Sequence, residues 1–134
     1  MGELIDTSIW VDFFRHETPA PIRELARSLV TRAEVVTGEP IWLELLQGVP
    51  KKRLRLVENF FETVPMVSTP LSLWREALPL ARACHEAGHP VSTLDVLIAA
   101  LAAHHGLRLV TFDRDFGVLA EHAGVKMEII SRPP

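Results

Sequence analysis

The sequence predicts an α/β fold in which helices cover both faces of a central parallel sheet of about five strands. Short segments rich in Val, Ile and Leu alternate along the chain with longer segments whose apolar residues recur at helical spacing. The short segments are apolar almost throughout, as expected of strands buried on both faces of a parallel sheet. Prolines and glycines separate the segments, and such an alternation of strands and helices favours parallel pairing.

The N-terminal elements are a strand and two helices. Residues 3–6 predict a short buried strand, and a helix follows it at once. That helix is indicated by an apolar stripe at i, i+1, i+4 and i+5 spacing, formed by Ile9, Trp10, Phe13 and Phe14. Pro19 and Pro21 separate it from a second helix at residues 21–32, whose apolar residues again lie on one side.

The next elements are two strands around two helices. Residues 35–37 predict a very short strand, and Pro40 then suits the first turn of a helix that ends at Gly48. A basic helix at residues 51–62 leads into a strand at residues 64–67. Within that strand, Pro65 donates no hydrogen bond, so we expect the strand at an edge or in a poorly paired position.

The C-terminal half predicts three helices and two strands. A long helix extends from Pro70 to Gly88, and Pro79 predicts a kink or a break within it. The remaining elements are a helix at 92–105, a strand at 107–111, a short helix at 116–122 and a strand at 127–130. Most aromatic residues, including the three tryptophans, are interpreted as core residues: Trp10, Trp42 and Trp74.

The composition agrees with one compact domain over residues 1–134. A chain of 134 residues can bury roughly two-thirds of its unfolded surface, and 48% of the residues are hydrophobic. The longest apolar run, at residues 96–103, is too short to span a bilayer. The acidic start lacks the basic and apolar segments of a signal peptide, and the single Cys84 suits the cytosol. We therefore expect a cytoplasmic protein without membrane contact.

Five acidic residues stand where apolar segments end or are interrupted: Asp6, Glu44, Asp95, Asp113 and Asp115. A carboxylate among Leu, Ile and Val risks a desolvation that disfavours its charged form. Asp6 and Asp113 follow strands, and the carboxyl ends of parallel strands meet at one edge of a sheet. Glu44 and Asp95 lie near the starts of helices, which begin at this edge if they directly follow strands. Together they predict a cage of oxygen ligands for Mg²⁺ and metal-assisted phosphodiester chemistry.

The net charge of −3 does not exclude a nucleic-acid substrate. Without the five candidate carboxylates, the chain has 14 basic and 12 acidic residues (17 minus 5), which leaves a remainder of +2. Bound divalent ions would make the acidic cage itself attractive to phosphate. The small number of spare cations predicts weak non-specific binding.

Helix capping is the competing explanation for three of these carboxylates. Ser92 and Asp95 have the spacing of a capping box, and Asp6 and Asp113 each suit the start of the following helix or turn. Glu44 has no such role. The helix face that Asp95 shares with small residues indicates a close neighbour, which would bury a mere cap; these residues are Ala99, Ala102 and Ala103.

Three hydroxyl residues flank the acidic set: Thr7, Ser8 and Thr111. Such hydroxyls can orient carboxylates or bound water. Ordinary turn chemistry is the alternative, and it is the preferred interpretation for Ser8.

Four segments resemble a known family: IDTSIWVDFFR, WLELLQG, GHPVSTLDVLIAALAAHHG and LVTFDRDF. In this order and at these separations, they resemble the PIN-domain ribonucleases, and more narrowly the VapC toxins of bacterial and archaeal toxin–antitoxin pairs. The resemblance covers nearly the whole chain. It implies a single PIN-like domain, an endoribonuclease that uses Mg²⁺ with Mn²⁺ as a substitute, homodimers, and a small VapB-like antitoxin that blocks the site.

The resemblance also assigns roles to individual residues. Asp6, Glu44, Asp95 and Asp113 take the four acidic positions, Asp115 the frequent fifth, and Thr111 the hydroxyl position before the last pair. The resemblance implies Asp6 and Asp95 as the most consistent Mg²⁺ ligands. Whether one or two metal ions bind stays open, as does whether Glu44 or Asp115 holds the attacking water.

Two other functional classes are compatible with parts of the pattern. A phosphotransfer domain of the receiver or haloacid-dehalogenase type also places Asp at strand ends, but here Asp6 lacks a second Asp two residues on. A non-catalytic RNA- or protein-binding module of the same fold is the other alternative, although none of the acidic positions is lost. The basic run of residues 51–55 is interpreted as a solvated helix face, with binding of RNA phosphate as the alternative.

Overall fold

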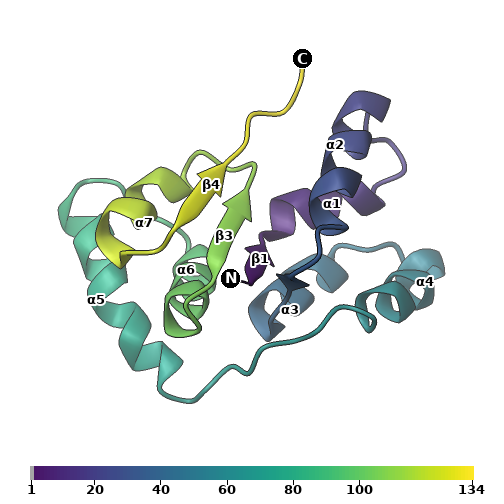
Figure 1. Cartoon of the computed structure of the whole chain (residues 1–134). Coiled ribbons are helices and arrows are strands. Elements are labelled where there is room, and N and C mark those ends of the chain that lie inside the picture. Colours follow the sequence, from purple (N-terminus) through teal and green to yellow (C-terminus); the bar gives the residue numbers. More distant parts are fainter. Residues whose placement is uncertain (1) are drawn as a thin grey trace.

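A four-stranded parallel sheet forms the centre of the molecule (Figure 1). The computed structural model describes residues 2–134. Its strands pair in the order β2-β1-β3-β4, with the bounds β1 (Glu3–Ile5), β2 (Val35–Val36), β3 (Arg108–Thr111) and β4 (Met127–Ile129). The prediction of an α/β fold around a parallel sheet is therefore confirmed.

Helices connect the strands and cover both faces of the sheet. Figure 1 shows α7 beside β4, whereas α3 and α4 lie at the other side of the molecule. Their bounds in chain order are α1 (Thr7–Phe14), α2 (Ala20–Val30), α3 (Glu39–Gln47), α4 (Lys51–Phe61), α5 (Leu73–Glu86), α6 (Thr93–His104) and α7 (Phe116–Ala123). Every predicted helix is present within a few residues of its expected bounds.

The predicted strand at residues 64–67 is the exception, and the sheet has four strands instead of about five. The segment forms only an isolated bridge between Met66 and Thr37. The Thr37 N–H donates to the Pro65 carbonyl at 2.9 Å, and the Val67 N–H donates to the Thr37 carbonyl at 2.8 Å. Because Pro65 has no N–H to continue the ladder, the pairing stops after this bridge.

Helix α5 continues through Pro79, so of the predicted kink or break the break does not occur. Its buried face is apolar and consists of Leu73, Ala77, Leu80 and Cys84. Pro79 lies on the exposed face, and the carbonyl that loses its helical hydrogen bond belongs to Arg75, which is also exposed. Water can therefore satisfy this carbonyl, and the helix stays intact.

Helix α6 is the central helix of the core. Its residues 96–102 are all buried, and it packs against α5, α7, α3 and β3. Ala99 and Ala102 are fully buried, as the small-residue face predicted, but Ala103 is exposed. No helix within residues 2–134 is long and apolar enough to cross a membrane.

The tryptophans differ from the predicted pattern. Trp10 is fully buried, and its ring centroid lies 4.9 Å from that of Phe61 in an edge-on arrangement. Trp42 and Trp74 are 42% and 62% exposed, so their assignment to the core is wrong.

The order of the strands indicates where a ligand-binding site would lie on the sheet. From β1 the chain continues to β2 on one side of the sheet and later returns to β3 on the other side. Ligands in open parallel sheets bind at the carboxyl ends of the strands where this change of direction occurs. Asp6 follows β1 directly, and Asp113 lies two residues beyond the end of β3.

Candidate active site

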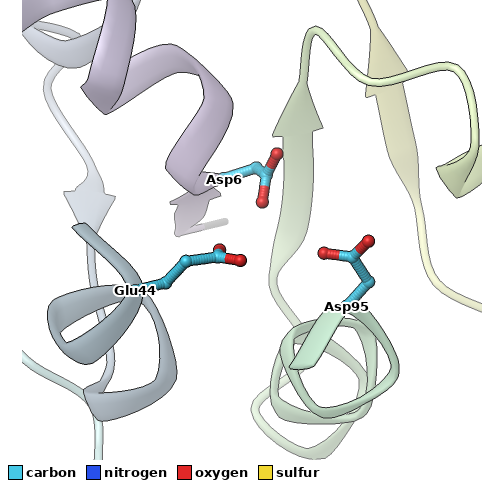
Figure 2. Close-up of side chains that lie close together, drawn as sticks. All are labelled: Asp6, Glu44 and Asp95. Atoms are coloured by element: carbon cyan, nitrogen blue, oxygen red, sulfur yellow. The ribbon is translucent and has the colours of Figure 1, made fainter. Parts of the chain in front are cut away.

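Three carboxylates from distant parts of the chain converge at this edge of the sheet (Figure 2). Asp6 follows β1, Glu44 lies in α3, and Asp95 lies in the first turn of α6. One carboxylate oxygen of each lies within 4.8 Å of those of the other two. Two ligand oxygens of one Mg²⁺ ion are at most about 4.2 Å apart, twice the ion's bond length of about 2.1 Å. A small inward movement would therefore bring all three carboxylates to a single ion.

Asp6 is held by three hydrogen bonds that all end on its Oδ2 atom. The Ser8 N–H donates at 3.3 Å, the Ser8 hydroxyl at 2.8 Å, and the Thr111 hydroxyl at 2.8 Å. Burial raises the pKa of Asp6, and the hydrogen bonds from Ser8 and Thr111 oppose that rise because they stabilise the charged form. Asp6 is also the N-cap of α1, so both sequence interpretations of this residue describe its geometry.

Two hydroxyls connect the end of β1 with the end of β3. Thr111 is fully buried; it donates to Asp6 and accepts the Asp113 N–H at 2.9 Å. Ser8 also donates to Asp6, and it accepts the Phe112 N–H at 3.2 Å. Each hydroxyl has one proton, which goes to the carboxylate, so its oxygen is left as an acceptor for a backbone N–H of the segment that follows β3.

The supporting role expected of Thr7 falls to its neighbour Ser8. The Thr7 hydroxyl is buried and has no hydrogen-bond partner within residues 2–134. Ser8 occupies the second position of α1, whose N–H commonly bonds to the N-cap side chain. The position of Ser8 two residues after Asp6 is therefore the sequence signal for its role, beside the turn chemistry that the sequence favours.

Asp95 combines a capping contact with a place in the cluster. Its N–H donates to the hydroxyl of Ser92, the N-cap of α6, at 3.2 Å. Burial, followed by repulsion from Asp6 and more weakly from Glu44 and Asp113, raises the pKa of Asp95 to about 6. In the described part of the chain, no Lys or Arg forms an ion pair with any of the three carboxylates. A divalent cation would relieve this repulsion, so the residues fit a metal centre.

The last two acidic residues lie differently from the other three. Asp113 is outside the three-carboxylate cluster, yet it is close enough to contribute to the raised pKa of Asp95. Its Oδ1 accepts the Asp115 N–H at 2.9 Å, so it also forms the turn that leads into α7. Asp115 is exposed and does not belong to the cluster found among residues 2–134. The fold thus gathers three of the five predicted carboxylates, keeps Asp113 at the rim, and leaves Asp115 outside.

Comparisons with known proteins agree with this architecture. The model of the PIN domain family matches residues 4–122. VapC ribonuclease Mb1587 of Mycobacterium bovis is 36% identical over 121 residues, which cover 87% of this chain and 90% of that protein.

Solved structures share the fold at lower identity. The structure of VapBC2 from Rickettsia felis bound to a promoter DNA fragment has a TM-score of 0.76 at 16% identity and covers 98% of this chain and 100% of that chain. The DNA-bound VapBC from Salmonella typhimurium has a TM-score of 0.73 at 21% identity, with coverage of 96% and 98%. The family match and the VapC relative together account for nearly all of the described elements, and the chain therefore belongs to the PIN-domain family, with VapC ribonucleases among its relatives.

Proposed function

We propose that this protein is a Mg²⁺-dependent endoribonuclease and the toxin of a VapBC-type toxin–antitoxin module. The observation that carries the proposal is the convergence of Asp6, Glu44 and Asp95, three hard oxygen ligands without a neutralising Lys or Arg in the described chain. The names of the relatives, which are VapC ribonucleases, support RNA as the substrate.

Asp6, Glu44 and Asp95 are the residues that would hold the ion, with Asp113 at the rim. When bound, Mg²⁺ supplies a water of lowered pKa and stabilises negative charge on phosphate oxygens. Ser8 and Thr111 keep the Asp6 carboxylate oriented and favour its charged form. Asp115 lies outside the cluster, so of the two residues considered for holding the attacking water, Glu44 is the one that would lie beside the ion. No side chain of the protein is required as a nucleophile.

Removal of the metal is expected to abolish cleavage. Purified protein without antitoxin should cut RNA, with tRNA as the first substrate to test, in Mg²⁺ or Mn²⁺, and EDTA should stop the reaction. Excess Mg²⁺ should restore the rate, and the ion should also raise the melting temperature because it binds only the folded protein. Cleavage that continues undiminished in EDTA would disprove a metal mechanism.

A VapB-like antitoxin is the partner that we infer, since the structural relatives are VapBC complexes. The antitoxin would lay an apolar helix in a groove and place a basic side chain at the three carboxylates, where a charge-assisted hydrogen bond is strong. Expression of the protein alone should arrest growth of its host, and co-expression of the antitoxin should relieve the arrest. Absence of any growth effect from soluble, metal-loaded protein would favour the non-catalytic binding module instead.

We also propose a homodimer that forms through the outer face of α5. Two apolar residues on that face are open to solvent: Trp74 is 62% exposed and Leu78 is 59% exposed. Leu71, which is 93% exposed, lies in the turn before the helix. Trp74 and Leu78 are four residues apart, so they share one helix face and would be covered by the same face of a second copy.

Trp74→Glu is therefore expected to convert the dimer into a monomer while the fold is kept, because the side chain is 62% exposed and is not one of the buried core residues. Light scattering after size exclusion would measure the mass. The control is Leu56→Glu on α4, which removes a similarly exposed apolar side chain away from α5. Equal mass for wild type and Trp74→Glu would rule out this interface.

A further inference from the structure

A large cavity begins at one of the three carboxylates. Its volume is about 860 Å³, and it lies between α1 with the loop that follows it, α3, and the start of α4. Glu44 belongs both to the three-carboxylate cluster and to the wall of this cavity, which we name the α4 cavity. A molecule bound there would lie directly beside the candidate metal centre.

The lining of the α4 cavity is apolar in one part and cationic in another. The apolar part consists of Val11, Phe14, Leu45, Val49 and Val57. The ring of Phe14 is fixed by neighbouring rings, with centroids 4.9 Å from Phe13 and 5.3 Å from Phe60. The basic side chains in the lining are Arg15, His16, Lys52 and Arg53. An apolar wall with an aromatic ring and a cationic rim matches a nucleotide, which has an apolar base face and a charged phosphate.

Lys52 and Arg53 are available to bind a ligand. Neither side chain forms an ion pair or a hydrogen bond with any residue in the range 2–134, whereas Arg15 is paired with Glu17 at 3.8 Å. With histidine neutral, the lining has three positive groups (Arg15, Lys52 and Arg53) and two negative ones (Glu17 and Glu44), so its net charge is +1. Neutralisation of Glu44 by a bound cation would make the cavity more attractive to phosphate.

The position of these cations disfavours the interpretation that they merely form a solvated helix face. Lys52 and Arg53 lie in the first turn of α4, where the positive end of the helix dipole repels cations. That turn contains no acidic residue, and Pro50 provides no side-chain cap. The arrangement costs stability in the free protein, and an anion that neutralises the cations would recover it.

We propose that the α4 cavity binds the nucleotide next to the scissile phosphate in a single-stranded segment of the RNA substrate. Lys52 and Arg53 bind its phosphate, and its base packs on the apolar wall against Phe14. The base must be unpaired to enter, so the cavity selects loops and other single-stranded regions. This proposal rests on the proposed ribonuclease function and adds a substrate subsite to it.

A matched pair of double variants tests the cationic rim. Lys52→Ala with Arg53→Ala removes two charges that line the cavity, and Lys51→Ala with Arg55→Ala removes two charges from the same helix that do not line it. The probe is a short, unstructured RNA oligonucleotide, measured by binding in EDTA and by cleavage in Mg²⁺. We expect the first variant to raise Kd and KM about tenfold, with the control within about twofold. The slope of log Kd against log salt should fall by about 1.4, which is 0.7 for each of two phosphate contacts on a single strand.

Abasic oligonucleotides test the apolar wall without any change to the protein. Loss of the base at a single position beside the cut should weaken binding by wild type about tenfold, as expected for one stacked base. The same substitution at the other positions should have little effect. Uniform effects at all positions would contradict a base-binding wall.

Several outcomes would overturn the proposal. Equal effects of the two double variants, or an unchanged salt slope, would mean that Lys52 and Arg53 do not bind phosphate. Intact RNA binding by Lys52→Ala/Arg53→Ala together with weakened binding of the antitoxin would assign the cavity to a protein partner. The EDTA measurement separates this proposal from the proposed function: a wild type that binds the oligonucleotide selectively but never cleaves it would contradict only the nuclease activity.

Discussion

Asp95→Asn is expected to abolish RNA cleavage and to weaken Mg²⁺ binding strongly. Asparagine has almost the size of aspartate, and the N–H of residue 95 can still donate to Ser92. The substitution removes the negative charge that a hard cation requires from one of only three carboxylates in the cluster. Loss of a residue that only hydrogen-bonds to a metal ligand lowers metal affinity or activity by about 10- to 100-fold. Loss of a direct ligand should therefore lower the cleavage rate by at least about 100-fold. Single-turnover cleavage and Mg²⁺ titration calorimetry measure the two effects.

Ser92→Ala is the matched control, because it removes the cap and keeps the charge. It should cost about 1 kcal/mol of stability, as N-cap losses do, and leave cleavage nearly unchanged. The opposite pattern, in which Asp95→Asn cuts RNA normally while Ser92→Ala destabilises the protein, would restrict Asp95 to a capping role.

Because the pKa of Asp95 is raised, thermal unfolding in EDTA is a second measurement that distinguishes Asp95→Asn from wild type. A carboxyl whose pKa rises from 3.8 to about 6 on folding binds its proton more tightly in the folded state. Its ionisation therefore weakens the folded protein as the pH rises through that window, and the cost persists at pH 7. Thermal unfolding without metal should show this loss of stability in wild type, whereas the Asn variant should lack it and melt at an equal or higher temperature near pH 7.

The convergence of Asp6, Glu44 and Asp95 could be predicted because parallel topology decides it. Asp6 follows β1, and Glu44 lies in α3, the helix that follows β2. Helix α6 does not follow a strand, but it leads through a short turn into β3, so its N-terminal turn with Asp95 lies at the edge where β3 ends. The position of Asp115 could not be predicted, since it depends on the turn in which the Asp115 N–H, rather than the carboxylate, faces Asp113. That Ser8 rather than Thr7 bonds to Asp6 could not be predicted either. Neighbouring residues on a helix point about 100° apart, so only one of the two hydroxyls can face the carboxylate.

Helices with strong periodicity and strands next to them were predictable from local pattern alone. The segment at residues 64–67 forms only a bridge, because Pro65 has no N–H, and this agrees with the expectation that Pro65 leaves the strand poorly paired. The exposure of Trp42 and Trp74 was beyond prediction because composition cannot tell a buried tryptophan from an exposed one. The α4 cavity was not predictable either, since it arises where α1 packs near the consecutive helices α3 and α4, and a contact between such distant segments has no local signal.

Thr111→Val is expected to lower the cleavage rate by about 10- to 100-fold, the usual effect of losing an outer-shell partner of a metal ligand. Thr111 donates to Asp6 Oδ2 at 2.8 Å and accepts the Asp113 N–H at 2.9 Å. Valine keeps the shape of the side chain but removes both bonds. Asp6 then loses a donor that favours its charged form, and the Asp113 backbone loses the contact that positions it. Unfolding free energy should fall by about 1–3 kcal/mol, the cost of leaving buried polar groups without partners.

Thr7, the residue that follows Asp6, supplies a control for this prediction. Thr7→Val removes a hydroxyl that is equally buried but has no hydrogen-bond partner in the described chain, so activity and stability should be unchanged or slightly improved. Thr111→Ser, which keeps the hydroxyl, should retain most of the activity. Cleavage rates measured across a range of Mg²⁺ concentrations should show Thr111→Val needing more Mg²⁺ than wild type, because a less ordered Asp6 binds the ion more weakly. If Thr111→Val and Thr7→Val cut RNA equally well at every Mg²⁺ concentration, the bond from Thr111 to Asp6 has no part in the reaction, and the charge of Asp6 must be maintained by Ser8 alone.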